Sequence, residues 1–435
     1  MGHDPAARAT RARRARWVAT ALLLSVTLVV VVCATGRHRQ PKRRSSRDPV
    51  RIGRQVVAPA KLGDPWPQPW RDQAHTSLSP AVGPVVPVRL WEYRPPSDPD
   101  RSSSAQDIVG GLLVGRNGAV YVRYGETQPR MVAIGPDGGE SWTIPAPPVP
   151  AHGGIALTPD GTIRMCAGGE AYLIDPIGAV SEIVTARTDR LSTVGRDGTL
   201  YTTQGSSIAA TAPDGSELWT TAVEGTLVTT GPVIGDDGAV YALAATPSGG
   251  SRLYAFEPGG AERWSADLQG IAAHDGGVCI GADGTLYCGT DYGLSAVTRD
   301  GVVAWSTEVR PGVRLVPAAS PDGTIYVSGG NAISAVSRDG PVKWRYEASV
   351  GEAVKGNLVV DVQGSVYARS DRNVWAVRAD GKFRWVERFD AGNGPTANDT
   401  GYLALDDDGR LYCATPQGVV IAIGQAPDAG GKGRT

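Results

Sequence analysis

One short phrase recurs along the whole chain and constrains its fold more than any other feature. Asp-Gly, a variable residue, an apolar residue and Tyr occur in that order eight times, some copies carrying substitutions. The copies begin at Asn117, Asp160, Asp197, Asp237, Asp283, Asp322, Gln363 and Asp408. Their spacing averages roughly 42 residues, which is the length of one four-stranded propeller blade. A single blade cannot cover both of its faces, so the units must stack against one another.

A second phrase follows the first with a stricter spacing: Ala, then Gly five residues later, then Trp four residues further on. Six sets keep this spacing: Ala133–Gly138–Trp142, Ala210–Gly215–Trp219, Ala255–Gly260–Trp264, Ala296–Gly301–Trp305, Ala335–Gly340–Trp344 and Ala376–Gly381–Trp385. The second repeat departs from the rule, with Leu173, Gly178 and Glu182 at these places, and the eighth ends after Ala422 without a Trp. A Trp buries a large apolar area, and the small Ala and Gly leave room for it. We therefore expect seven structural Trp between blades: Trp91, Trp142, Trp219, Trp264, Trp305, Trp344 and Trp385.

The stretch "VRLWEYR" around Trp91 stands before the first repeat and has no unit of its own. As the outer strand of the last blade it would complete all eight blades and remove the open edge of an unclosed ring. The composition, with 57 Gly and three Phe, agrees with an all-β chain. The sequence therefore predicts an eight-bladed β-propeller of four-stranded blades, closed by an N-terminal strand. Seven blades and a separate hairpin are the alternative.

Five segments are predicted: a basic tail (1–16), an apolar segment (17–36), a basic flexible linker (37–63), the propeller (64–424) and a disordered tail (425–435). The apolar segment, "WVATALLLSVTLVVVVCATG", contains no charge, and about 20 residues suffice to span a bilayer. It predicts a transmembrane anchor, with a cleaved secretory signal and lipidation at Cys33 as the alternatives. Basic residues flank both of its ends, so charge alone does not fix its orientation.

The net charge of −1 hides a strong asymmetry along the chain. Residues 1–60 carry 13 Lys and Arg against two acids, and the remainder carries 30 Lys and Arg against 42 Asp and Glu. Because phosphate contacts require a basic face, the acidic propeller is not expected to bind nucleic acid. The basic residues beside the apolar segment suit a membrane flank.

Cys279 and Cys288 lie symmetrically about the Asp283-Gly284 turn in "VCIGADGTLYC". With a two-residue turn they would face each other across a hairpin, where a disulfide can form. They are a candidate disulfide, and two small buried apolar residues are the alternative. A one-residue bulge would put them out of register.

No arrangement of residues typical of a catalytic or metal site is found in the sequence. The five His form no His-x-His or His-x-x-x-His pair, and no Gly-x-Ser-x-Gly elbow is present. The run "DDDG" at Asp406 resembles a calcium loop only in its charge, because Gln417 stands where the loop needs Glu. We therefore predict no catalytic, cofactor-binding or metal-binding residue.

The repeat phrases resemble those of the quinoprotein alcohol dehydrogenase-like propellers, also called PQQ-like repeats. The stretch "WPQPWRDQAHTSLS" (66–79) resembles the Trp-Pro…Asp…Ala-His-Thr opening of many proteins in this group. The resemblance covers about residues 64–424 and implies the fold rather than an activity. The dehydrogenases of the group carry an adjacent-Cys disulfide beside their quinone, and this chain has no Cys-Cys pair. Similarity to the BamB-type non-catalytic propellers implies an exported, membrane-anchored scaffold.

These observations predict a membrane-tethered, extracytoplasmic, monomeric propeller that binds a protein partner in the cell envelope. It is expected to lie in the periplasm or outside the cell, or to be secreted if the signal is cleaved. We expect no enzyme activity and no cofactor, with neither pyrroloquinoline quinone nor Ca²⁺ bound. A quinone-dependent dehydrogenase and an extracellular ligand-sensing domain are the alternatives. Two irregularities are candidates for a binding face: the long loop "ATPSGGSR" (245–252) and the second repeat, which lacks its Trp.

Overall fold

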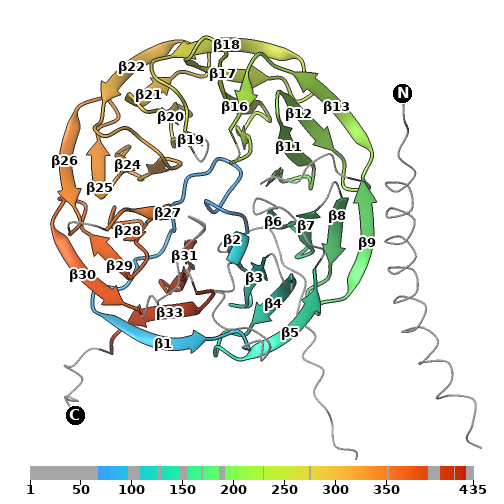
Figure 1. Ribbon diagram of the computed structural model, residues 1–435, viewed down its shortest axis with the longest axis vertical. Helices are drawn as coiled ribbons and strands as arrows, with labels where there is room; N and C mark the ends of the chain where they lie inside the picture. The colour runs from blue at the N-terminus through green and yellow to red at the C-terminus, as the bar shows by residue number, and fades with distance from the viewer. Residues whose placement is uncertain are drawn as a thin grey trace, which may run out of the picture. The chain divides into compact units, whose positions relative to one another are not determined.

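The computed structural model describes residues 67–96, 108–125, 129–146, 154–167, 170–185, 192–228, 230–273, 276–349, 352–389, 402–415 and 417–427. Within them the chain forms eight antiparallel sheets arranged as a ring (Figure 1), so the predicted eight-bladed propeller is confirmed. The predicted basic tail (1–16), apolar segment (17–36) and linker up to residue 63 lie outside the described residues. None of the described residues forms a helix long and apolar enough to cross a membrane.

Blades 1 to 4 follow one another along the chain, each running from an inner to an outer strand. Blade 1 contains β2 (Ile108–Val114), β3 (Val120–Tyr124), β4 (Arg130–Ile134) and β5 (Glu140–Pro145). Blade 2 contains β6 (Ile155–Leu157), β7 (Ile163–Ala167), β8 (Glu170–Ile174) and β9 (Val180–Thr185). Blade 3 contains β10 (Ser192–Val194), β11 (Leu200–Gln204), β12 (Ser207–Thr211) and β13 (Glu217–Ala222). Blade 4 has a divided inner strand, β14 (Thr226–Leu227) and β15 (Val233–Ile234), followed by β16 (Val240–Ala245), β17 (Ser251–Phe256) and β18 (Glu262–Leu268).

Blades 5 to 8 complete the ring. Blade 5 contains β19 (Val278–Ile280), β20 (Leu286–Gly289), β21 (Gly293–Val297) and β22 (Val303–Glu308). Blade 6 contains β23 (Ala318–Ala319), β24 (Ile325–Gly329), β25 (Ala332–Val336) and β26 (Val342–Glu347). Blade 7 contains β27 (Lys355–Val360), β28 (Val366–Arg369), β29 (Asn373–Val377) and β30 (Phe383–Arg388). Blade 8 contains β31 (Leu403–Leu405), β32 (Leu411–Ala414), β33 (Val420–Gln425) and, as its outer strand, β1 (Pro87–Tyr93).

Strand β1 closes the ring by pairing with the last strand of the chain. The two are antiparallel, with Pro87 opposite Gln425 and Tyr93 opposite Val420. The stretch around Trp91 is therefore the missing outer strand of blade 8, as the sequence predicted. β33 ends at Gln425, one residue beyond the predicted propeller boundary.

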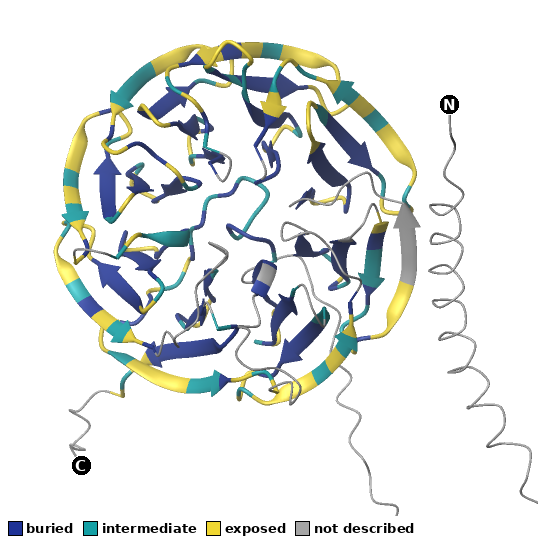
Figure 2. Cartoon of the chain, viewed as in Figure 1, coloured by how far each residue is buried: buried dark blue, intermediate teal, exposed yellow. Residues whose placement is uncertain are grey.

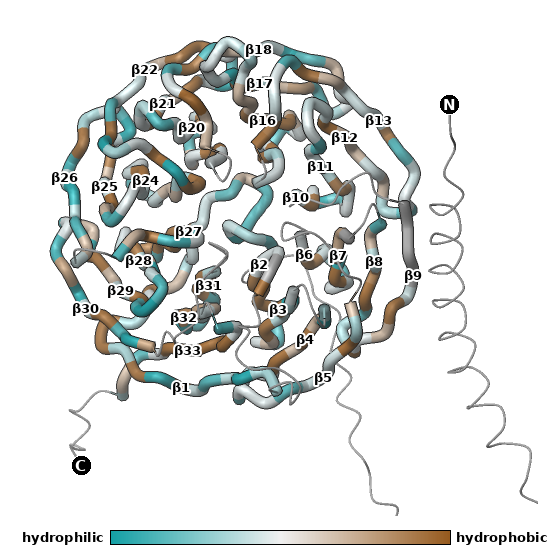
Figure 3. The backbone as a smooth tube through the Cα atoms, viewed as in Figure 1, coloured by the Kyte–Doolittle hydropathy of each residue, from teal (hydrophilic) through white to brown (hydrophobic). Residues whose placement is uncertain are grey.

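Burial follows the order of the strands within each blade. The inner strands β6, β19 and β31 are buried along their whole length, and their residues form continuous apolar runs. The outer strands alternate between exposed and half-buried residues, as in β5, β13 and β26. Figures 2 and 3 show the same division, with buried, apolar strands inside the ring and exposed residues on its rim.

Each Asp-Gly phrase forms the turn between the first and second strands of a blade, and the turn is longer than expected. In blade 5 the Gly284 amide donates to Gly281 O (2.8 Å), and the Gly281 amide donates to Thr285 O (2.9 Å). Asp283 Oδ1 accepts the Thr285 amide (3.0 Å), and Gly284 has φ +81°. Asp-Gly therefore occupies the last two places of a three-residue loop, in which Gly takes the left-handed conformation, and not the centre of a two-residue turn.

Every outer strand has a β-bulge immediately before the position at which seven of the eight blades have Trp. In blade 3, Ala210 pairs with Trp219 and Thr211 pairs with Glu217, which leaves Leu218 without a partner across the ladder. Blade 8 has the same irregularity in β1, between Arg89 and Trp91. A bulge increases the local twist of a strand and changes the direction of the side chain beside it. The bulge therefore turns each Trp toward the next blade.

Candidate binding site at the channel mouth

A segment of the chain before β1 crosses the middle of the ring (Figure 1), and we call residues 67–83 the strap. Backbone carbonyls of the strap accept amides at the ends of five inner strands: Leu157 to Pro67 O (2.7 Å), Ile234 to Gln73 O (2.8 Å), Ile280 to Ala74 O (2.9 Å), Ala319 to Thr76 O (3.0 Å) and Val360 to Ser77 O (2.9 Å). In a sixth blade the side chain of Gln68 accepts the Val194 amide (3.0 Å) and donates to Val194 O (3.0 Å). The strap thus satisfies polar backbone groups that the inner edges of six blades present to the channel.

Asp72 holds the strap in its bent course. Its carboxylate accepts the amides of Ala74 (3.1 Å) and Thr76 (3.0 Å), and also the Thr76 hydroxyl (2.5 Å). Four non-glycine residues of the strap have positive φ, between 53° and 77°: Trp70, Arg71, His75 and Ser77. Each such residue costs on the order of 1 kcal/mol or more, so the surrounding contacts must hold the strap in place.

His75 lies inside the propeller beneath the ring of Trp70, with the two ring centroids 4.8 Å apart. Its Nε2 is 3.2 Å from Thr193 Oγ1, and that hydroxyl donates to Pro232 O (2.6 Å). The Thr193 oxygen must therefore accept, which assigns the proton to Nε2. Burial lowers the pKa of His75 from 6.5 to about 3, so the imidazole is neutral at physiological pH.

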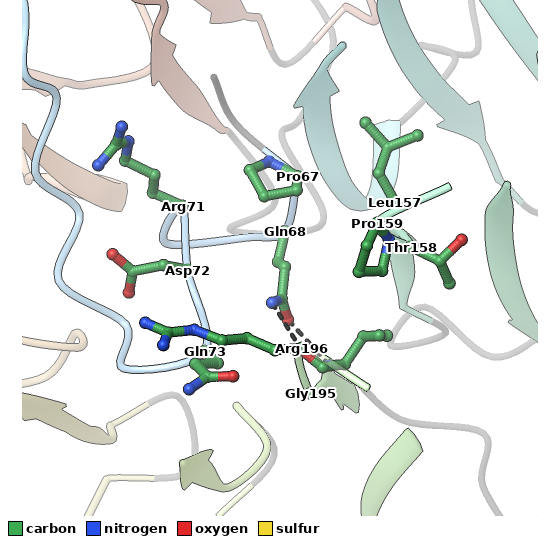
Figure 4. A pocket seen from close by; sticks show the side chains of 11 residues that line it. Pro67, Gln68, Arg71, Asp72, Gln73, Leu157, Thr158, Pro159, Gly195 and Arg196 are labelled. Carbon is green, nitrogen blue, oxygen red and sulfur yellow. Dashed lines mark hydrogen bonds between the residues drawn. The ribbon is translucent and has the colours of Figure 1, made fainter. Parts of the chain in front are cut away.

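The strap borders a pocket of about 250 Å³, which we call the mouth pocket (Figure 4). Its lining residues are Pro67, Gln68, Arg71, Asp72 and Gln73 of the strap, Leu157, Thr158 and Pro159 of blade 2, and Val194, Gly195 and Arg196 of blade 3. Figure 4 shows Gln68 bonded to blade 3 and Arg196 close to the strap. The pocket thus has apolar walls of proline and leucine and two cationic side chains.

The seven Trp connect every blade except blade 2 to the next one. In every case the indole Nε1 donates to a carbonyl of the following blade: Trp91 to Pro136 (3.0 Å), Trp142 to Pro176 (3.0 Å), Trp219 to Pro258 (2.8 Å), Trp264 to Arg299 (2.8 Å), Trp305 to Arg338 (2.9 Å), Trp344 to Ala379 (2.8 Å) and Trp385 to Pro84 (2.6 Å). Each Trp also packs against the Tyr of its own blade, with ring centroids 5.7 to 6.2 Å apart. For six of the seven, all but Trp385, the accepting turn carries the repeat Gly at positive φ, and the indole lies over it: a Cβ on Gly260 would lie 2.4 Å from Trp219 Cδ2.

Blade 2 is built differently. Arg164 stands where the other blades have the Tyr, and Leu173 pairs with Glu182 where the others pair Ala with Trp. Arg164 is 4% exposed, and its Nη2 donates to Pro213 O (2.9 Å). Pro213 precedes Gly215 by two residues, as Pro258 precedes Gly260. Arg164 therefore donates to the carbonyl that accepts an indole N–H at the other junctions.

A second pocket, of about 350 Å³, lies at this altered junction, and we call it the junction pocket. It is lined by Thr158, Pro159, Asp160, Thr162, Arg164 and Leu173 of blade 2 and by Arg196, Asp197, Gly198 and Pro213 of blade 3. Thr158, Pro159 and Arg196 also line the mouth pocket, so the two pockets are neighbours on the same face. Sequence analysis noted the missing Trp but not the pocket, although "DGTIR" already showed Arg in place of Tyr.

The predicted disulfide is wrong in its register. Cys279 pairs with Tyr287 and Cys288 pairs with Val278, so the two Cys point to opposite faces of the hairpin. The reason is the additional residue in the turn described above. The four Cys among the described residues are free and buried, and burial raises the pKa of Cys279 and of Cys288 well above the usual thiol value. Such thiols are protonated and weakly reactive.

The other predicted irregularity, residues 245–252, is a compact loop between β16 and β17. It joins the second and third strands of blade 4, and therefore lies on the face of the ring opposite to the Asp-Gly turns and the strap. Arg252, at its end, forms ion pairs with Glu224 (3.0 Å) and Asp267 (2.6 Å). Among the described residues, no group of three or more His, Cys, Asp or Glu is placed to hold a metal ion.

The blades, the Trp contacts and the strap define an eight-bladed β-propeller. The resemblance predicted from the repeat phrases is confirmed, because residues 249–430 match the family described as outer membrane protein assembly factor BamB. No curated protein sequence matches the chain.

Solved structures show the same architecture. BamB from Moraxella catarrhalis is 18% identical, with a TM-score of 0.53, covering 78% of this chain and 98% of its own. The C-terminal WD40 domain of Sif2 is 11% identical, with a TM-score of 0.59, covering 80% and 99%. The dihydro-heme d1 dehydrogenase NirN is 13% identical, with a TM-score of 0.52, covering 65% and 67%. At these identities the similarity shows the fold alone, which serves binding proteins and an enzyme alike.

Proposed function

We propose that this chain is a membrane-tethered, non-catalytic protein-interaction scaffold whose propeller lies outside the cytoplasm. The observation that carries the proposal is the strap, which bonds to the inner strands of six blades and fixes the turn face of the ring as a rigid surface. A rigid surface loses little conformational entropy when a partner binds, and this small loss favours high affinity. The match of residues 249–430 to an assembly-factor family supports the same role.

We propose that residues 17–36 are the membrane tether, because this uncharged apolar segment is long enough for a single membrane span. A cleaved signal and lipidation at Cys33 are the alternatives, and both of these export the propeller, whereas for a retained anchor the exported orientation is part of the proposal. Mass spectrometry of the chain purified from membranes distinguishes them. An intact N-terminus supports the anchor, and a chain beginning after Val32 contradicts it.

Cross-linking in cells tests the scaffold role. The tagged full-length chain is cross-linked, purified from membranes and analysed by mass spectrometry. We expect the same envelope protein to be recovered repeatedly. A chain recovered without any partner would contradict the scaffold proposal and direct attention to the ligand-sensing alternative, with glycans as the first ligands to try.

The proposed absence of catalysis and of a cofactor is tested on the purified full-length chain. It is mixed with pyrroloquinoline quinone and Ca²⁺, and reduction of a redox dye is followed with a panel of alcohols. We expect no reduction above the rate of free quinone. Turnover that depends on the protein would instead support the quinone-dependent dehydrogenase.

A further inference from the structure

We infer that the junction pocket between blades 2 and 3 is a docking site for a Trp side chain presented by a partner protein. The inference rests on the proposed scaffold function and names the face that the partner uses. Each of the seven other blade junctions accommodates an indole, and these junctions show how an indole binds between two blades.

The complete junctions show the geometry with which an indole binds. At the contact of blades 3 and 4, Trp219 donates to Pro258 O (2.8 Å), and its ring packs over Gly260. Tyr201 of the same blade lies 6.2 Å away between ring centroids, and Phe256 of the next blade lies 6.3 Å away. An aromatic ring thus closes the space between the two blades and buries apolar area on both sides.

Blade 3 retains the accepting half of such a junction. Gly215 has φ +85°, the same as Gly260, and its amide closes an equivalent turn to Ala212 O (2.9 Å). Pro213 presents its carbonyl at the position of Pro258. Blade 3 therefore retains the turn on which an indole packs at other junctions, and the outer strand of blade 2 has no Trp at the corresponding position. The Pro213 carbonyl accepts Arg164 Nη2 (2.9 Å) and keeps a second lone pair for another donor.

The walls of the junction pocket suit an aromatic ring. Pro159, Leu173 and Pro213 line it with apolar surface, and the buried Arg164 lines it with a planar cation. A guanidinium stacks on an aromatic face more favourably than an ammonium does, and Trp is the preferred partner in cation–π contacts. The carboxylates of Asp160 and Asp197, which also line the pocket, are acceptors within it for an indole N–H.

Two changes to the purified full-length chain test the site. Pro159→Trp places a ring at a turn position that other repeats fill with Arg, Asp, Ala, Pro or Val, so the fold should tolerate it. The triple variant Arg164→Tyr, Leu173→Ala and Glu182→Trp rebuilds the junction as the other repeats have it. Pro321→Trp is the matched control, because Pro321 occupies the same turn position in blade 6 and is exposed.

The probe is N-acetyl-L-tryptophanamide, observed by saturation-transfer difference NMR. We expect the wild-type chain and Pro321→Trp to bind it equally, and both pocket-filling variants to bind at least about tenfold more weakly, as expected when a ring is excluded from its pocket. Equal binding by all four chains, or no binding by the wild type, would overturn the inference.

Cross-linking of the same four chains in cells separates this inference from the proposed function. A partner captured by the wild type and by Pro321→Trp, but not by the pocket-filling variants, supports both. A partner captured equally by all four chains overturns the docking site and leaves the scaffold intact. If no chain captures a partner, the scaffold fails, and the NMR result alone decides whether the pocket binds an indole.

Discussion

A glycine at a blade junction is under two separate constraints, a left-handed backbone conformation and close contact with an indole. Gly260 has φ +85°, and an added Cβ would lie 2.4 Å from Trp219 Cδ2. Gly249, in the 245–252 loop, has φ +84° with nothing within 4 Å of an added Cβ. The two positions therefore separate the cost of the backbone conformation from the cost of steric contact with the indole.

We predict that Gly249→Ala lowers the free energy of unfolding by about 1 to 2 kcal/mol, the cost of left-handed backbone for a residue with a Cβ. Gly260→Ala should cost at least about 2 kcal/mol more, because the indole must also move out of a packed contact. Urea denaturation of both variants measures the difference. Equal destabilisation would show that the indole contact with Gly260 is easily displaced.

His75 makes the stability of the protein depend on pH. Its pKa is lowered from 6.5 to about 3 on folding, so the unfolded chain binds the proton first as pH falls. The stabilisation that this His provides is complete above pH 6.5 and is lost as pH falls from 6.5 toward 3. From pH 7.5 to pH 5.5 it should amount to about 1.4 kcal/mol.

A variant that cannot titrate tests this prediction. His75→Phe should be less stable than the wild type at pH 7.5, because the bond to Thr193 is lost. The difference in free energy of unfolding between the two chains should narrow by about 1.4 kcal/mol at pH 5.5. A difference that stays constant over this range would mean that His75 titrates normally.

At the scale of elements, the strands were predictable and the turns only in part. Repeat length and the Ala–Gly–Trp spacing predicted the blades, because the residues that pack between neighbouring blades recur at the same place in each repeat. The Asp-Gly phrase predicted a turn but not its length, since the same dipeptide fits a two-residue loop and the end of a three-residue one. The additional residue shifted Cys279 and Cys288 to opposite faces.

The strap is the element that sequence analysis could not place. It has no periodicity, and its partners are distant in sequence, so local propensity carries no information about them. Asp72 and His75 were visible only as part of the "WPQPWRDQAHTSLS" stretch. The two pockets depend on the strap and on a junction where two repeat positions change together, at Arg164 and Glu182.

We predict that Asp72→Ala loosens the strap and exposes the inner-strand amides to solvent. Hydrogen exchange at Leu157, Ile234, Ile280, Ala319 and Val360, which donate to strap carbonyls, should become about tenfold faster or more. Asp137→Ala is the control, because Asp137 makes a similar bond to the Gly139 amide (3.1 Å) in blade 1, away from the strap. Unchanged exchange in Asp72→Ala would show that the channel contacts hold the strap without its Asp.

At the scale of the whole molecule, the number of blades and their closure were predictable because the Asp-Gly phrase recurs eight times at a similar spacing and one strand was left over. The binding face was not predictable from the sequence, because a closed ring offers two faces and a rim of similar composition. The structure separates them, since the strap and both pockets lie on one face and the 245–252 loop lies on the other.

We predict that ring closure needs the residues before blade 1. A chain beginning at residue 64 should unfold in one cooperative calorimetric transition near that of the full chain. A chain beginning at residue 96 lacks the strap and β1, so β33 loses its partner and Trp385 loses its acceptor at Pro84. It should lose the cooperative transition, and an unchanged melting temperature would contradict the role assigned to these residues.

Blade 8 joins the beginning of the propeller to its end, and this has a consequence for the time course of biosynthesis. β1 leaves the ribosome before any other strand, whereas β33 is almost the last part of the chain to be made. At roughly 5–20 residues per second, β1 waits on the order of tens of seconds for its partner. During that interval its unpaired edge and the exposed Val88 and Leu90 are open to chaperones, proteases and other nascent chains. A premature stop between residues 93 and 420 leaves the circle open, so each such truncated product carries the same unpaired strand, β1.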